Sequence, residues 1–178
     1  MNNPEYILTD EMQVVIDAVK VALGIPVLNF QHGYVQELNQ TLTQWEKSPT
    51  KSSMKFPLVW LAEPFTISRG LNIGLYGEAD IDLYIINTTR KDWKAKERMD
   101  NNFKPVIYPI YREILNQFTL IPTFVHVAVD QIKHVTTNRY FWGDNNKSVL
   151  NDVIDCMKVS GLQLRIADKQ NCEILSNF

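Results

Sequence analysis

The residues whose types and spacing could do chemistry are Asp80 and Asp82, in the segment 78–83, Glu-Ala-Asp-Ile-Asp-Leu. Side chains two positions apart on a strand share a face, so these two carboxylates could hold a divalent cation between them. Two-metal phosphoryl transfer requires such a carboxylate pair. The same alternation of acids and aliphatic residues is typical of a strand with one face in water, and we prefer this second interpretation.

Segment 79–83 resembles the Asp-x-Asp strand of nucleotidyltransferases. The resemblance implies a metal-dependent nucleotidyltransferase or nuclease in which Asp80 and Asp82 bind the metal. That family also carries a Gly-Ser turn that opens a helix upstream, and residues 69–74 contain no Gly-Ser pair. We therefore keep this function as the alternative hypothesis.

The other residue types common in active sites show no such spacing. His32, His126 and His134 are scattered, so we expect hydrogen-bonded core or edge histidines rather than metal ligands. Cys156 and Cys172 fit neither a paired metal motif nor a disulfide framework, which predicts free thiols. The preferred interpretation therefore has no catalytic residue, no metal and no cofactor.

The hydrophobic pattern predicts a single α+β domain over residues 1–178, with a mixed, mostly antiparallel sheet. An N-terminal helix over 10–23, stopped by Gly24, and a long central helix pack on one face of this sheet. The long helix lies within residues 92–118, and Pro105 divides it into a leading and a main helix.

The remaining elements follow from shorter patterns in the sequence. A second helix is expected over about 34–46, a flexible loop over 47–55, and an extended hairpin or loop over 64–77. Residues 149–159 fit both a helix and a strand, and the Ser160-Gly161 pair favours a C-terminal hairpin. Strands are expected at 27–30, 56–62, 78–88, 123–129, 135–142 and 162–166.

Composition limits the classes of partner. The 178-residue chain has a formal net charge of −2, which argues against binding nucleic acid through a broad basic surface. No apolar run approaches the length of a bilayer span, and the N-terminal residues lack the pattern of a signal peptide. We therefore expect a protein that folds in a cytoplasm, with no membrane partner and no sequence-specific nucleic acid.

Several segments together resemble the small neck and tail-completion proteins of tailed bacteriophages, of the tail-terminator type. The resembling segments are 10–23, 55–61, 80–85, 105–111, 139–143 and 151–155. The resemblance implies a virion structural protein, made in the bacterial cytoplasm, that assembles into a homo-oligomeric ring between the capsid connector and the tail. It further implies portal or adaptor and tail proteins as neighbours, DNA passing through the ring, and loops 47–55 or 64–77 reaching an adjacent subunit.

A ring subunit needs two different complementary patches, because cyclic assembly is head-to-tail. Interfaces are enriched in aromatic residues, so aromatic side chains beside loops or charged stretches are the candidates. These interface candidates are Trp45, Trp93, Tyr140 and Trp142. A cytoplasmic binding module with no virion role is a third hypothesis.

Overall fold

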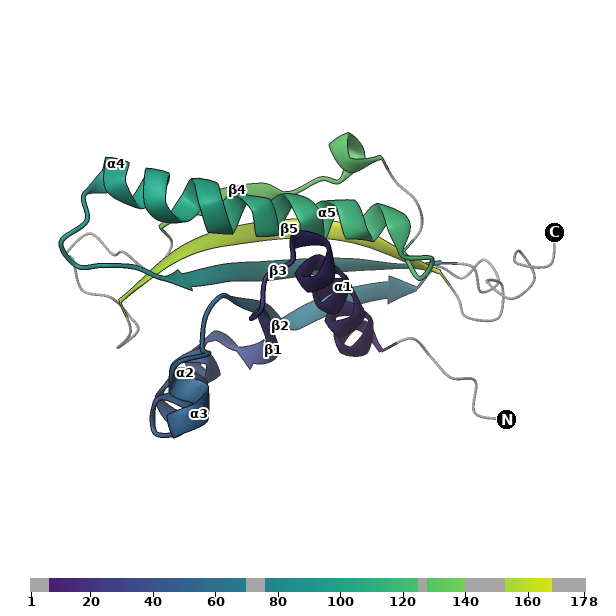
Figure 1. The fold of residues 1–178 in the computed structure, drawn as a ribbon. Helices are drawn as coiled ribbons and strands as arrows, with labels where there is room; N and C mark the ends of the chain where they lie inside the picture. Colours follow the sequence, from purple (N-terminus) through teal and green to yellow (C-terminus); the bar gives the residue numbers. More distant parts are fainter. Residues whose placement is uncertain (1–6, 70–75, 125–127, 140–152, 168–178) are drawn as a thin grey trace.

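The computed structural model describes residues 7–69, 76–124, 128–139 and 153–167 (Figure 1). The helical elements are α1 (Leu8–Leu23), α2 (Val35–Glu46), α3 (Pro49–Ser52), α4 (Ala95–Arg98), the π-helical η1 (Met99–Ile107), α5 (Tyr108–Leu120) and the 3₁₀ turn η2 (Val129–Gln131). The strands are β1 (Asn29–Tyr34), β2 (Leu58–Arg69), β3 (Tyr76–Thr88), β4 (Val135–Asn138) and β5 (Ile154–Ala167).

These five strands form one sheet in the order β1-β2-β3-β5-β4. β1 runs parallel to β2, and every other neighbouring pair is antiparallel. The chain is therefore α+β with a mixed, mostly antiparallel sheet, as the sequence predicted.

One face of the sheet is covered by α1 and by the continuous helical run from α4 through η1 to α5, which lies along the strands in Figure 1. The periodic apolar residues of α1, such as Met12 and Val19, are buried there against Ile110 and Ile114 of α5. The alternating residues of β3, such as Ile81 and Leu83, point to the same face. Both predicted helices thus pack on this face.

The opposite face is covered over only part of its area. Leu38 and Leu42 of α2 pack on Trp60, Tyr84 and neighbouring side chains of the sheet in a second, smaller apolar cluster. The remaining part of this face, toward the end of β2 and the start of β3, bears polar side chains. This division leaves the predicted carboxylates on an open surface.

The sequence predicted that Pro105 divides the central helix, and this prediction is wrong. Residues 95–120 are helical throughout, and Pro105 lies inside the π-helical segment η1. Proline lacks an N–H and crowds the preceding turn, so a locally widened turn accommodates it with less conflict than a regular α-helix. Pro109 lies in the first turn of α5 and breaks nothing there.

The predicted C-terminal hairpin is wrong. Residues 154–167 form one strand, which decides the helix-or-strand alternative for the described part of 149–159 in favour of strand. Gly161 has φ 62° and lies at a bulge, because the register against β3 shifts between Ile81 and Leu83. A glycine in the left-handed backbone conformation occurs both in tight turns and at β-bulges, and from the sequence alone we predicted the turn.

Three other segments also differ from their predictions or refine them. Residues 49–52 of the expected loop form the short helix α3. Around the expected hairpin, β2 and β3 pair antiparallel as far as Arg69 opposite Gly77, and residues 70–75 lie outside the described residues. In place of a strand over 123–129 there is an isolated bridge from Phe124 to Ile166 and the turn η2, with 125–127 not described.

Candidate functional site

The open part of the second sheet face is a polar surface built by three strands. We call it the open sheet face; its side chains are Thr66, Ser68, Glu78, Asp80, Asp82, Gln163 and Arg165. The register places Thr66 beside Asp80 and Asp80 beside Gln163, while Ser68, Glu78 and Arg165 form the next row. Hydroxyls on β2, carboxylates on β3 and amide or basic groups on β5 thus stand side by side.

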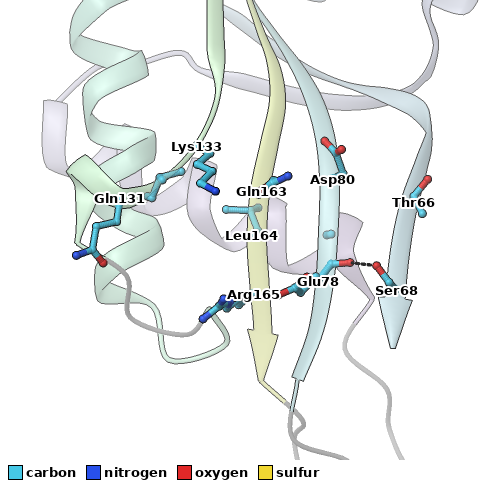
Figure 2. A pocket seen from close by; sticks show the side chains of 11 residues that line it. Thr66, Ser68, Glu78, Asp80, Gln131, Lys133, Gln163, Leu164 and Arg165 are labelled. Atoms are coloured by element: carbon cyan, nitrogen blue, oxygen red, sulfur yellow. Dashed lines mark hydrogen bonds and ion pairs between the residues drawn. The ribbon is translucent and has the colours of Figure 1, made fainter. Parts of the chain in front are cut away.

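A shallow hollow of about 500 Å³ lies over this surface, shown in Figure 2. Gln131 and Lys133, from the segment before β4, complete its rim beside β5. Glu78 and Arg165 form an exposed ion pair at 3.3 Å. Acidic groups on β3 lie beside basic groups on and next to β5, so the surface has no strong field of one sign that would concentrate a charged ligand.

The structure brings Asp80 and Asp82 to one face of β3, as the sequence predicted, but it gives them different surroundings. The Asp82 Oδ2 atom lies 2.7 Å from Lys158 Nζ, and its Oδ1 accepts a hydrogen bond from the Gly161 N–H at 3.0 Å. Asp82 therefore joins β3 to β5 at the bulge. Asp80 is exposed beside Thr66 and Gln163.

Metal ligation by this pair would compete with the bonds that Asp82 already makes. Within residues 7–69, 76–124, 128–139 and 153–167, no three His, Cys, Asp or Glu side chains are grouped so that they could hold a metal ion. The described geometry therefore offers Asp80 as the single carboxylate of the pair that is open to an incoming cation.

Two of the four interface candidates lie in the described residues. Trp45 is partly buried against the smaller apolar cluster, which contains Leu38 and Leu42 of α2. Lys51 Nζ lies 5.6 Å from the centroid of the Trp45 ring. Trp93 is also partly buried, and the Arg90 guanidinium carbon lies 5.8 Å from its ring centroid. Both tryptophans keep some exposed area, so their role in an interface stays a prediction. Tyr140 and Trp142 lie outside the described residues.

The described histidines are bonded within the chain. His32 Nδ1 lies 2.7 Å from Glu63 Oε1. His134 Nδ1 lies 2.7 Å from the Ile132 carbonyl oxygen, which can only accept, so this nitrogen carries a proton and Nε2 is left to accept from the Tyr111 hydroxyl. Burial raises the pKa of Tyr111 above its usual value. His126 lies outside the described residues.

A buried polar network is the largest feature that sequence reasoning missed. Arg98 stands among lysines and acids in the sequence, as is typical of an exposed helix, yet its side chain is buried and bonded to Asp155 at 3.0 Å. Asn102 donates to the second oxygen of Asp155 at 2.8 Å and accepts from Asn87 at 2.7 Å. The network fastens the start of the central helical run to β3 and β5, so its role is structural.

The outward side of α1 carries aliphatic residues that sequence reasoning also missed. Ile7, the residue before α1, and Val14 and Val21 within it recur every seven residues and are 58%, 51% and 81% exposed. Exposed single aliphatic residues are common, but three at a regular seven-residue spacing are a repeated pattern. Their seven-residue spacing was visible in the sequence, where the stronger apolar face of the same helix drew attention instead. We call these three residues the α1 outer line.

Neither a protein-family model nor a curated protein matches the chain. No described helix has both the length and the apolar character that crossing a membrane would require.

Proposed function

We propose that this chain is a structural protein of the bacteriophage neck or tail junction rather than an enzyme. In this proposal it is made in the bacterial cytoplasm and becomes part of the virion. Copies of the chain form a homo-oligomeric ring that joins the capsid connector to the tail. Portal or adaptor proteins and tail proteins are its neighbours, DNA passes through the ring, and no cofactor takes part.

The observation that carries the proposal is the α1 outer line. Burying an exposed aliphatic side chain against another protein would contribute about 25 cal/mol of favourable free energy for every Å² of apolar surface removed from water. The other face of α1 is fully used in the core, where Met12, Val15 and Ile16 have no exposed area. The exposed side of α1 bears Val14 and Val21 among polar residues such as Gln13 and Asp17. Exposed aliphatic residues on a helix whose inner side already fills the core fit a subunit that is buried further on assembly.

The polar residues support the same interpretation. Asp82 and Asp155, two of the acids that face other strands or helices, are held in bonds to Lys158, Gly161, Arg98 and Asn102. Carboxylates bonded in this way fix the positions of the strands and helices that carry them. Each oxygen of these two carboxylates already has a partner within the chain.

The native mass of the purified full-length chain, measured by multi-angle light scattering, tests the proposal. We expect a concentration-stable assembly of several subunits that appears as rings in negative-stain electron microscopy. A chain that stays monomeric at high concentration, also after addition of candidate portal and tail proteins, would contradict a ring-forming role. Detection of the chain in purified virions separates this role from that of a cytoplasmic binding module.

The alternative is a metal-dependent nucleotidyltransferase or nuclease that uses Asp80 and Asp82. One observation favours it: both carboxylates lie on the open sheet face, and Asp80 lines a hollow large enough for a small ligand. Binding of Mg²⁺ or Mn²⁺ to the folded state would raise the melting temperature. Absence of such a shift in the wild-type chain, together with unchanged properties of Asp80→Asn, would exclude this alternative.

A further inference from the structure

The sheet ends in two different strands on opposite sides, β1 and β4, which are the outer strands of the described sheet. The Asn29 N–H donates to the Pro57 carbonyl at 3.0 Å, so the backbone groups of Asn29 point toward β2. Backbone groups alternate in direction along a strand, which turns those of Phe30 and His32 toward the outer edge. The next outward N–H, at Tyr34, is bonded to the Glu37 carboxylate at 2.9 Å and closes that edge.

The directions of the strands determine how these two edges could meet. β1 and β2 run one way, β3 runs the other way, β5 runs with β1, and β4 runs opposite to β5. β4 is therefore antiparallel to β1. A second copy placed beside the first in the same orientation would present its β1 edge antiparallel to β4, which is the more stable kind of strand pairing.

The two edges also lie at the same height in the sheet. One row of register partners runs from Gln31 through Trp60, Tyr84 and Lys158 to Thr137. The rows on either side run from Phe30 to Asn138 and from His32 to Thr136. A neighbouring copy could therefore reach the β4 edge with its β1 edge without a large shift along the strands, as a closed ring requires.

The residues of both edges favour pairing over protection. All four side chains of β4, Val-Thr-Thr-Asn, are exposed, and three of them are β-branched. Natural proteins protect sheet edges with lysine, proline, inward charges or very short edge strands. Neither β1 nor β4 contains lysine or proline, although β4 has only four residues and Glu37 limits the β1 edge at Tyr34. The remaining backbone groups of these edges are available for a short pairing with another chain.

We propose that the β4 edge of one subunit pairs antiparallel with the β1 edge of the next, so that the five-stranded sheet continues from subunit to subunit. The occupant of each edge is a second copy of this chain, and the contact is head-to-tail, because one edge meets the other rather than itself. This inference rests on the proposed ring, in which the β1 and β4 edges are the contact between neighbouring subunits. α1 packs on one face of the sheet and contacts β1, and we assign its exposed outer line to other neighbours.

Cysteine cross-linking of full-length chains tests the contact. One preparation carries Gln31→Cys and another carries Thr137→Cys, both with Cys172→Ser, while Cys156 is buried and left in place. Gln31 and Thr137 are exposed and lie in one row, on the same sheet face. After mixing, reassembly and mild oxidation, we expect disulfide-linked dimers in the mixture and none from either preparation alone. The pair Gln40→Cys with Thr137→Cys, where Gln40 is an exposed residue of α2, is the control and should not link.

Cysteines at positions 29 and 31, each combined with a cysteine at position 135 or 137, would also detect a pairing of β1 with β4 that is shifted by a few residues. A chain carrying both substitutions should give a ladder of linked species that ends at the ring size. Linked dimers from Gln31→Cys alone would show that β1 pairs with β1, and would overturn the inference. If the chain assembles but no combination of cysteines links, the pairing of β1 with β4 is wrong and the proposed ring is not contradicted. If light scattering shows a monomer, both the pairing and the ring are contradicted.

Charge substitutions at the same positions give an independent measurement. Like charges placed directly opposite on paired strands are destabilising, so Gln31→Glu with Thr137→Glu should weaken each subunit contact by up to about fivefold. Gln31→Glu with Thr137→Lys should restore it. Equal assembly of these two double variants would contradict the proposed contact.

Discussion

Arg98 and Asp155 form an ion pair that is closed off from solvent between the central helical run and β5. Arg98 Nη1 lies 3.0 Å from Asp155 Oδ1, and the Asp155 side chain is fully buried. Arg98 also donates to the backbone carbonyls of Trp93 at 2.9 Å and Arg90 at 3.2 Å. One side chain thus connects the loop before α4, the helix itself and the sheet.

Replacing Asp155 with asparagine should destabilise the fold strongly. Asp155→Asn leaves the Arg98 guanidinium buried without its counter-charge, and such a loss costs about 3 to 5 kcal/mol in the free energy of unfolding. Urea denaturation measures it. Asp92→Asn is the matched control, because the Arg90–Asp92 pair is 66% exposed on both side chains and contributes less than about 1 kcal/mol. Equal effects of the two substitutions would contradict a structural role for the buried pair.

The sequence could not predict this pair, although it predicted the helix that carries Arg98. Local periodicity and the Gly24 stop are sufficient for α1, and strict alternation is sufficient for β3. Arg98 lies among exposed lysines and acids, and its partner lies on a strand far along the chain. Local pattern reports which side of an element is apolar. It does not report which distant charge will be brought beneath that element.

The same limit applies to the candidate site. Alternation was sufficient to place Asp80 and Asp82 on one face of β3. The contacts of Asp82 depend on the register of β5 and on the bulge at Gly161, which sequence reasoning assigned to a turn. The π-helical accommodation of Pro105 was likewise beyond local rules, because those rules describe proline only as a break in a regular helix.

Substitutions at the two aspartates should have unequal effects on stability. Asp82→Asn weakens the contact with Lys158, which is partly buried, and should cost about 1 kcal/mol in the free energy of unfolding. Asp80→Asn, at an exposed position, should change it by less than about 0.5 kcal/mol. Chemical denaturation with and without Mg²⁺ measures both effects. A larger effect at Asp80, or one that appears only with Mg²⁺, would support the metal-dependent alternative.

Gly33 is required by the contact between Glu37 and the start of α2. Gly33 has φ 145°, and a Cβ there would lie 2.4 Å from Glu37 Oε2 and 3.2 Å from Trp60 Cζ2. Gly33→Ala should therefore displace the Glu37 carboxylate from the Tyr34 N–H and cost about 2 kcal/mol or more, from lost capping and backbone strain.

Gly24→Ala is the matched control for that substitution. Gly24 has φ 62°, and a Cβ added there would meet nothing within 4 Å, so only the backbone conformation is penalised, by about 1 kcal/mol. Thermal or urea denaturation compares the two variants. A Gly33→Ala chain as stable as the Gly24→Ala chain would show that Glu37 moves aside at no cost.

The Cys156 thiol should make the fold less stable at alkaline pH. Burial, and then the nearby Asp155 carboxylate, raise its pKa well above the ordinary value of 9.0. The raised pKa belongs to the folded state, so the unfolded chain loses its thiol proton first. Stability is therefore full below pH 9.0 and falls as pH rises toward the folded pKa. Unfolding free energy measured against pH should fall less steeply in Cys156→Ala, and equal slopes would contradict the assignment.

Substitutions on the α1 outer line should weaken assembly without weakening the subunit. Val14 and Val21 point away from the core, so Val14→Lys and Val21→Lys should leave the free energy of subunit unfolding within about 0.5 kcal/mol of wild type. Burying a lysine in a contact made for valine should weaken that contact about tenfold or more. Sedimentation velocity with the neighbouring proteins present measures the change, and Gln40→Lys on exposed α2 is the control. α1 packs against α5 and contacts the edge strand β1, but the substituted side chains are exposed. If the subunits pair through the backbone groups of β1 and β4, self-assembly should survive these substitutions. Loss of the ring itself would place the subunit contact on α1 instead.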